Sequence, residues 1–304
     1  MKQNEMEIGK VKLNLEYYEG QDLYSDGDIE DEILEIVKNR KDYDRAISDS
    51  NRFEVFYHLS KEREMIARVM DITKHDNVLE IGAGCGAITG ALAQMAGSVE
   101  CVELSKRRSL INAYRNRECD NIFINIGNYE NIKFKRKYSI ITLIGVLEYA
   151  GYYIHSKDPY KDFLIDIRKK MEENGILYIA IENRLGMKYF AGCKEDHIGR
   201  EFVGIEGYNN QNGVRTFSYY ELIELFTSTG FSEWKFYYPY PDYKFPHAIY
   251  SEEYLPEKGC FEEKGTNYTS SRKSVFNETQ AFDSLVMKDE FKIFSNSFLI
   301  ALRK

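Results

Sequence analysis

The sequence has no C-x-x-C pair, no surplus of basic residues and no long apolar run, and each absence excludes a class of protein. The five cysteines are an odd number without metal-ligand spacing, so we expect reduced thiols in the cytoplasm and neither a zinc site nor a disulfide framework. A net charge of −8 argues against a nucleic-acid partner. No stretch reaches the roughly 18 apolar residues of a spanning helix, and the N-terminus lacks the apolar region of a signal peptide.

The remaining composition is that of a globular protein. Hydrophobic residues make up 43% and charged residues 30% of the 304 positions, with no internal repeat. Aromatic residues reach 14%, with 24 tyrosines. Tyrosine at this density is typical of pockets and interfaces, because the ring is buried while the hydroxyl stays hydrogen-bonded.

From Val78 onward, short apolar runs alternate with amphipathic segments, which is typical of a sheet covered by helices. We expect helices over residues 60–70, 158–173 and 218–229, with Gly230 ending the last. The sequence therefore predicts an α/β fold with one doubly wound sheet. Its seven strands are expected at residues 78–81, 99–104, 122–126, 139–144, 176–181, 234–238 and 298–303.

We divide the chain into an N-terminal acidic and helical cap, residues 1–58, and a core of residues 59–304. Residues 21–36 of the cap carry seven acidic residues and no basic one; their apolar residues favour a helix on the core, with a disordered tail as the alternative. Two insertions interrupt the core. Residues 183–213 are polar and rich in glycine, as in a substrate lid, and residues 239–291 hold all but one of the prolines.

The motif V-L-E-I-G-A-G-C-G-A-I-T, residues 78–89, combines a strand, a glycine turn and the start of a helix. Glycines let the backbone turn sharply and approach a ligand, and the helix N-terminus offers free N–H groups. Gly82, Gly84 and Ala87, with Glu103 further on, also satisfy the dinucleotide fingerprint. Glu80 favours another cofactor, since a carboxylate there would suit a cationic ligand and repel a pyrophosphate.

Four motifs in order resemble those of class I S-adenosylmethionine-dependent methyltransferases. After the first come V-E-C-V-E-L-S, N-I-G-N and I-I-T-L-I-G-V-L-E-Y, and the resemblance is strongest over residues 52–181. It implies a Rossmann-like, seven-stranded doubly wound sheet of order 3-2-1-4-5-7-6 with the last strand antiparallel. It also implies S-adenosylmethionine as the cofactor and S-adenosylhomocysteine as its product.

The resemblance further implies which residues contact the cofactor. The glycine turn and Glu80 would hold the methionine end, and Glu103 would accept both ribose hydroxyls. Where the family commonly has Asp beside the adenine amine, this chain has Asn128, whose amide oxygen can also accept that N–H. The complete set is Tyr57, Arg63, Glu80, Gly82, Ala83, Gly84, Gly86, Glu103, Leu104, Gly127, Asn128, Tyr129, Val146, Leu147 and Glu148.

The first two and the last three residues of this set have different expected roles. Tyr57 and Arg63 lie in F-Y-H-L-S-K-E-R, which resembles a lead-in segment that closes over the cofactor, although Tyr57 could equally belong to the core. Val146 to Glu148 would line the floor near the transferred methyl group.

The first insertion and Y-S-D-G-D-I-E-D-E-I-L resemble a bacterial subgroup associated with two kinds of gene cluster. In one, such enzymes modify ribosomally made peptides, including C-terminal carboxyl methylation of lanthipeptide type; in the other, they modify surface glycans. We therefore expect O-methylation of a peptide C-terminal carboxylate. The alternatives are O-methylation of a glycan or nucleotide-sugar and a non-catalytic cofactor-binding module.

The insertion supplies both cations and a histidine for this chemistry. A carboxylate acceptor is already ionised and needs cationic orientation, whereas a hydroxyl needs a general base such as His197 or Glu182. We take His197 and Arg184 as catalytic candidates. Metal is not implied, and the oligomeric state cannot be read from the sequence. The predicted substrate contacts are Asn183, Lys188, Arg200, Tyr208 and Arg215.

Overall fold

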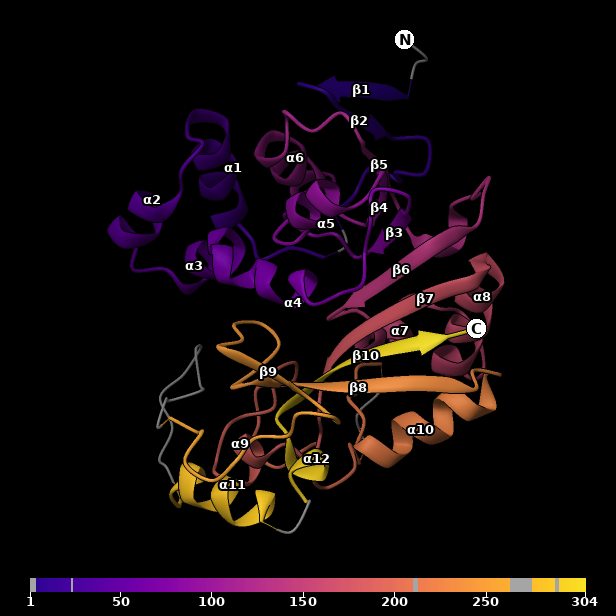
Figure 1. The fold of residues 1–304 in the computed structure, drawn as a ribbon. Coiled ribbons are helices and arrows are strands. Elements are labelled where there is room, and N and C mark those ends of the chain that lie inside the picture. Colours follow the sequence, from indigo (N-terminus) through magenta and orange to yellow (C-terminus); the bar gives the residue numbers. More distant parts are fainter. Residues whose placement is uncertain (1–3, 23, 210–212, 263–274, 288–289) are drawn as a thin grey trace. The chain divides into compact units, whose positions relative to one another are not determined.

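The chain folds as two compact units, one of residues 1–143 with 170–176 and the other of residues 144–169 with 177–304 (Figure 1). The computed structural model describes residues 4–22, 24–209, 213–262, 275–287 and 290–304. Residues 1–3 and 23 of the predicted cap, 210–212 of the first insertion, and 263–274 and 288–289 of the second lie outside these ranges.

The first unit is built on a mostly parallel sheet with the strand order β1-β2-β5-β4-β3-β6. From β2 to β6 every neighbouring pair is parallel, and only β1 is antiparallel. Central strands such as β3 and β5 are almost wholly buried, as expected for strands covered on both faces. The strands are β1 Glu5–Ile8, β2 Val11–Asn14, β3 Asn77–Ile81, β4 Ser98–Glu103, β5 Ile122–Ile126 and β6 Tyr138–Ile144.

Short helices connect and cover these strands. The helix α6 begins after Ser105, whose hydroxyl accepts a hydrogen bond from the Arg108 backbone N–H at 3.2 Å and so caps the helix. The helices are α1 Ile29–Asn39, α2 Asp44–Asp49, α3 Phe53–Leu59, α4 Met65–Arg68, α5 Thr89–Met95 and α6 Lys106–Arg115, with 3₁₀ turns η1 Lys61–Glu64 and η2 Tyr129–Asn131.

The second unit holds β7 from residue 177 onward and has the strand order β7-β10-β8-β9, with β10 and β9 both antiparallel to β8. Its helix α10 begins with a capping box in which the side chains of Ser218 and Glu221 each accept the other's backbone N–H. The strands are β7 Met171–Glu182, β8 Glu233–Tyr240, β9 Ala248–Ser251 and β10 Ser297–Arg303. The helices are α7 Ala150–Tyr153, α8 Pro159–Lys170, α9 Met187–Phe190, α10 Tyr219–Ser228, α11 Glu278–Val286 and α12 Phe291–Phe294, with the 3₁₀ turn η3 Leu147–Tyr149.

The predicted α/β sheet is confirmed in both units. The expected order 3-2-1-4 corresponds to β5-β4-β3-β6, and the expected order 5-7-6 corresponds to β7-β10-β8. The last predicted strand, now β10, is antiparallel to β8 as expected. All seven predicted strands are present, with ends shifted by a few residues.

The prediction of seven strands is too low, because the described residues form ten. The hairpin of β1 and β2 extends the sheet beside β5, where only a helical cap was expected. Gly9 forms the turn of the hairpin with a φ of 59°. Strands of four residues leave little periodicity to read, and this pair becomes stable only by pairing with β5. The third added strand, β9, lies within the predicted second insertion.

Two predicted helices have different bounds. The helix expected at 158–173 ends at Lys170, because the next residues begin β7. The helix expected at 60–70 is divided into η1 and α4. None of the helices in the described ranges is long and apolar enough to cross a lipid bilayer.

The acidic segment near the N-terminus contains an ordered helix. In α1, Ile29, Ile33 and Val37 are buried in a hydrophobic cluster that also includes Leu59 and Ile111, and α1 packs against α6 (Figure 1). The helix interpretation of residues 21–36 is therefore confirmed from Ile29 onward, and the disordered-tail alternative is wrong for that part. The acidic residues face solvent except Glu30, which is buried.

A buried ionic network attaches this segment to α6. The Arg108 guanidinium donates from Nε to Glu30 Oε1 at 2.7 Å and pairs through Nη2 with Asp26 Oδ2 at 2.8 Å. Ser25 Oγ and the Asp26 backbone N–H also donate to Glu30, at 2.9 and 2.8 Å. His58 Nε2 lies 2.8 Å from Asp26 Oδ2. The network gives every buried charge a partner of opposite sign.

We expect Glu30→Ala to lower the free energy of unfolding by about 3–5 kcal/mol, because the buried Arg108 loses its main partner. Glu32→Ala is the control: its partner Arg52 lies at 3.6 Å with both side chains about half exposed, and its loss should cost less than about 1 kcal/mol. Urea denaturation followed by circular dichroism measures both. Equal effects of the two substitutions would show that the network does not attach α1.

Candidate functional site

The turn after β3 in the first unit depends on three left-handed glycines. Gly82, Gly84 and Gly86 have φ values of 74°, 52° and 74°, a region that glycine enters without a steric penalty. A Cβ on Gly86 would lie 2.4 Å from Asn112 Oδ1, whereas a Cβ on Gly84 would meet nothing within 4 Å. Gly86 is therefore required for packing against α6, and Gly84 leaves open space beside the turn.

Glu103, the last residue of β4, holds this turn. Its Oε2 accepts the Gly84 backbone N–H at 2.7 Å, and its Oε1 accepts the Ser105 backbone N–H at 2.9 Å. Burial raises the pKa of Glu103, while Arg108 and the backbone N–H groups oppose the shift. An ionised carboxylate has about four lone-pair sites. The backbone N–H of Leu104 also interacts with this carboxylate, so the sites that Gly84, Ser105 and Leu104 do not use are the ones a ligand hydroxyl could reach.

The carboxylate of Glu80 lies beneath the turn and contacts α5. Thr89 Oγ1 donates to Glu80 Oε2 at 2.7 Å, and Asn112 Nδ2 donates to Thr89 Oγ1 at 3.0 Å. Burial raises the pKa of Glu80 to about 7, against the hydrogen bonds from Thr89 and Cys101. Sequence reasoning missed Thr89 and Asn112. Two features of the sequence could have indicated them. Thr89 opens the T-G-A-L start of α5, and Asn112 is a polar residue on the inner face of α6.

The other predicted cofactor contacts of the first unit lie on turns or at strand ends. Gly127 has a φ of 148°, and a Cβ there would lie 2.4 Å from the Tyr17 carbonyl oxygen. The Asn128 side chain caps η2 by accepting the Glu130 backbone N–H at 3.3 Å. Ala83 and Tyr129 are buried, and Leu104 is partly exposed after β4.

The predicted lead-in residues are brought together by a cation–π contact. The Arg63 guanidinium lies 4.1 Å from the centre of the Tyr57 ring. Arg63 is buried and Tyr57 is partly buried. Their contact with a cofactor stays a prediction, as do the roles of Glu80, Glu103 and Asn128.

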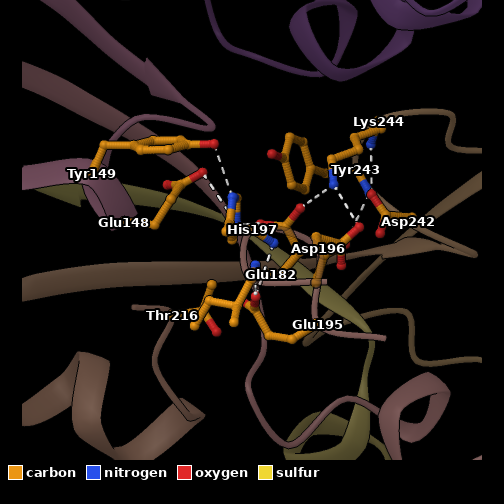
Figure 2. Close-up of polar contacts among 12 residues, drawn as sticks. Glu148, Tyr149, Glu182, Glu195, Asp196, His197, Thr216, Asp242, Tyr243 and Lys244 are labelled. Atoms are coloured by element: carbon orange, nitrogen blue, oxygen red, sulfur yellow. Dashed lines mark hydrogen bonds and ion pairs between the residues drawn. The ribbon is translucent and has the colours of Figure 1, made fainter. Parts of the chain in front are cut away.

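In the second unit, Glu148, Glu182 and His197 form an acid–histidine cluster (Figure 2). His197 Nε2 lies 3.4 Å from Glu182 Oε2 and 3.9 Å from Glu148 Oε1. His197 Nδ1 lies 2.9 Å from the Tyr149 hydroxyl. Both carboxylates are fully buried, and the imidazole is 7% exposed. The three residues come from the 3₁₀ turn η3, the end of β7 and the first insertion.

The cluster shifts the protonation of its own members. Burial opposes a charge on His197, but the hydrogen bond that it donates to Glu182 and the charges of the neighbouring glutamates outweigh burial and raise the pKa of His197 to about 9. Burial, with Glu182 adding to it, raises the pKa of Glu148 to about 8. At neutral pH, His197 is therefore an imidazolium and Glu148 is protonated. His197 can act as a general base only after it loses that proton.

A chain of lysine–carboxylate pairs continues from this cluster (Figure 2). Lys244 pairs with Glu182 and, at 3.0 Å, with Asp196 Oδ1. The buried Lys188 pairs with Asp196 at 2.9 Å and with Asp242 at 2.8 Å. Lys188, predicted as a substrate contact, thus neutralises the charges of Asp196 and Asp242. Sequence reasoning missed Lys244 and Asp242, because they lie far from the first insertion in the sequence.

The two arginines predicted to orient a carboxylate share one internal partner. Arg184 Nε donates to Glu221 Oε2 at 2.6 Å, and Arg215 Nη2 donates to Glu221 Oε1 at 3.0 Å. Arg184 also donates to the Gly204 carbonyl oxygen at 3.1 Å. Arg184 therefore attaches the first insertion, and Arg215 the segment after it, to the start of α10.

The remaining predicted substrate contacts are divided between interior and surface. Asn183 Nδ2 donates to the carbonyl oxygens of Ile293 and Ser295, both at 2.7 Å, and fixes the segment before β10. The Tyr208 hydroxyl donates to Glu195 Oε1 at 3.0 Å. Arg200 is exposed. Of the segment after β6, Leu147 is buried and the Glu148 carbonyl oxygen accepts the Arg215 backbone N–H at 3.1 Å.

The strand orders β5-β4-β3-β6 and β7-β10-β8 agree with the order 3-2-1-4-5-7-6. The chain therefore has a Rossmann-like α/β fold, with the strand order that the resemblance to class I methyltransferases implies. No protein-family model matches the chain.

Solved methyltransferase structures resemble the chain over most of its length. A methyltransferase from Thermotoga maritima that depends on S-adenosylmethionine covers 90% of this chain and 99% of its own, with 16% identity and a TM-score of 0.47. The N-methyltransferase NodS of Bradyrhizobium japonicum covers 84% and 98%, with 12% identity and a TM-score of 0.44. Phosphoethanolamine N-methyltransferase 1 of Haemonchus contortus covers 91% and 48%, with 14% identity and a TM-score of 0.47.

We expect stability to fall as pH rises through the titration of Glu80. Its pKa is raised from 4.5 to about 7, so between these values the folded protein holds a proton that the unfolded chain has lost. The free energy of unfolding should therefore decrease by up to about 3 kcal/mol from pH 4.5 to 7 and no further above it. Glu80→Gln should remove this pH-dependent part of the free energy of unfolding, while the amide oxygen still accepts the hydrogen bond from Thr89. Urea denaturation across pH measures the difference, and parallel curves for both proteins would contradict it.

Proposed function

We propose that the chain is a methyltransferase that uses S-adenosylmethionine. The observation that carries the proposal is the hydrogen bond from the Gly84 backbone N–H to Glu103, which places a carboxylate beside a left-handed glycine turn. When bound, S-adenosylmethionine supplies a methyl group activated by a sulfonium. Methyl transfer requires mainly positioning and removal of water, so the protein needs no nucleophile of its own.

The same turn is poorly suited to a dinucleotide. A pyrophosphate needs free N–H groups at the start of the helix. Here the Gly84 N–H is donated to Glu103, and the Gly86 N–H is donated to the Ala83 carbonyl oxygen at 3.0 Å. A buried carboxylate at this position would also repel a phosphate. Both features favour a cationic cofactor over NAD.

Different residues of the first unit would bind different parts of S-adenosylmethionine. Glu103 would accept the ribose hydroxyls through the lone pairs that the backbone N–H groups do not use. Asn128 would accept the adenine amine through its amide oxygen. Glu80 would supply a negative charge near the amino group and sulfonium. Arg63 and Tyr57 would cover the cofactor from the lead-in segment.

For the acceptor, the structure supports a hydroxyl better than a carboxylate. The peptide C-terminal carboxylate was expected because the first insertion is rich in cations, but Arg184 and Arg215 pair with Glu221, and Lys188 pairs with two aspartates. The contact between His197 and Glu182 favours the second candidate, O-methylation of a glycan or nucleotide-sugar, since deprotonated His197 can take a hydroxyl proton. Carboxyl methylation of a peptide, which the resemblance implied, is the alternative acceptor reaction, and the cytoplasmic location expected from the cysteines stays a prediction.

The cofactor assignment predicts that S-adenosylhomocysteine binds and that Glu103→Ala weakens it by at least about 10-fold, because charge-assisted hydrogen bonds to the ribose are lost. Isothermal titration calorimetry measures the dissociation constant. Glu118→Ala, which removes a carboxylate that is 71% exposed, is the control and should leave binding unchanged. Binding of NAD in place of S-adenosylhomocysteine would overturn the assignment.

The acceptor is tested by mass spectrometry of peptides and glycans incubated with protein and S-adenosylmethionine. We expect a mass gain of one methylene on a glycan, lost in His197→Ala, with a rate that rises with pH toward the pKa of about 9 of His197. A gain on a C-terminal peptide fragment would instead support carboxyl methylation. Cofactor binding without any gain would support the non-catalytic module.

A further inference from the structure

Within the described part of the chain, no other residue donates a hydrogen bond to the buried carboxyl group of Glu148. Both its oxygens are inaccessible to solvent, and its side chain is fully buried and directed toward His197 (Figure 2). An ionised carboxylate buried without such donors costs several kcal/mol, so this group stays protonated unless a cation binds it. A ligand that binds carboxylates would remove this cost.

The nearby lysines serve other acids. Lys244 pairs with Glu182 and Asp196, and Lys188 pairs with Asp196 and Asp242. Among the described residues, His197 is the cation-forming side chain within 4.0 Å of Glu148, at 3.9 Å, and the charge of Lys244 also acts on Glu148. Lys244 pairs with Oε1 of Glu182, whereas His197 lies beside Oε2.

We propose that Glu148, Glu182 and His197 form a binding site for one divalent transition-metal ion. Their ligand atoms all lie within 4.8 Å of one another. The separations from His197 Nε2 are 3.4 Å to Glu182 Oε2 and 3.9 Å to Glu148 Oε1. Around an ion with bonds of about 2.1 Å, these separations correspond to ligand–metal–ligand angles of roughly 105–140°. An open tetrahedral or five-coordinate site fits this geometry, with water as a further ligand.

The surroundings orient the ligands as in known metal sites. The Tyr149 hydroxyl lies 2.9 Å from His197 Nδ1. In the metal-bound form Nδ1–H donates to it, so that Nε2 carries the lone pair for the metal. Lys244 pairs with Glu182 Oε1, which leaves Oε2 as the ligand. His197 and Glu182 are therefore each held by an outer partner, and Glu148 is the ligand whose oxygens stay open to the ion.

The ligand types select the class of metal. One imidazole and two carboxylates suit Zn²⁺, Mn²⁺, Fe²⁺ or Co²⁺, whereas Mg²⁺ and Ca²⁺ prefer oxygen ligands alone. All three residues belong to the second unit. Metal binding at this site can therefore be measured without the proposed cofactor, although His197 cannot bind a metal through Nε2 and act there as a general base at the same time.

The test is metal binding to the full chain after treatment with a chelator. Titration calorimetry with Zn²⁺ and Mn²⁺ should give one ion per chain, and Co²⁺ should give the visible absorption of a four- or five-coordinate site. Glu148→Gln and His197→Ala should each weaken binding by at least about 100-fold, and Tyr149→Phe by about 10-fold. His75→Ala, which removes an exposed histidine of the first unit, is the matched control and should bind as the parent does.

Circular dichroism shows whether each variant folds, and Glu148→Gln keeps the size of the side chain if His197→Ala does not fold. No binding of any of the three metals to the parent protein would overturn the proposal. Binding that Glu148→Gln and Tyr149→Phe leave unchanged would also overturn it, since the ion would then lie elsewhere. A folded Glu148→Gln variant that is more stable than the parent and a parent that binds no metal would identify the cluster as a purely structural network.

Discussion

Six glutamates are buried among the described residues: Glu30, Glu80, Glu103, Glu148, Glu182 and Glu195. Each carboxylate must bind a proton, a hydrogen-bond donor or a cation, since an isolated charge costs several kcal/mol in a protein interior. The way in which each acid meets this requirement decides how the segments around it are arranged. In the first unit, the N–H groups of the glycine turn and Ser105 satisfy Glu103, while Arg108 satisfies Glu30.

The hydrogen bonds to Glu103 and the ion pair of Glu30 connect ligand binding with stability. The N–H groups that donate to Glu103 belong to the glycine turn and the helix start beside which a ligand would lie. Arg108 contributes to both, because it pairs with Glu30 and its charge opposes the rise in the pKa of Glu103. The N-terminal segment is therefore attached to the helix that follows the candidate ribose-binding carboxylate, and the acidic composition of this segment complements that basic residue.

The second unit meets the requirement with cations from distant parts of the chain. Lys188, from α9, and Lys244, after β8, both contact Asp196 of the first insertion, so the insertion is fixed by charge pairs. Glu148 is the acid that this network leaves without a hydrogen bond in the described residues. Lys188 of this network and, separately, Arg184 and Arg215 already pair with acids of the chain. For this reason we propose a hydroxyl acceptor ahead of the carboxylate that composition favoured.

The sequence by itself determined the α/β class, the seven central strands and the glycine turn, because these depend on local periodicity and on residues close together in the chain. It did not determine the hairpin of β1 and β2, whose short strands are stable only beside β5. It also could not separate free cations from paired ones in the first insertion. Arg184 and Arg215 meet Glu221, and Glu148 meets Glu182 and His197, only through tertiary structure. Ion pairs and ligand sets depend on distances in space, and sequence spacing does not encode those distances.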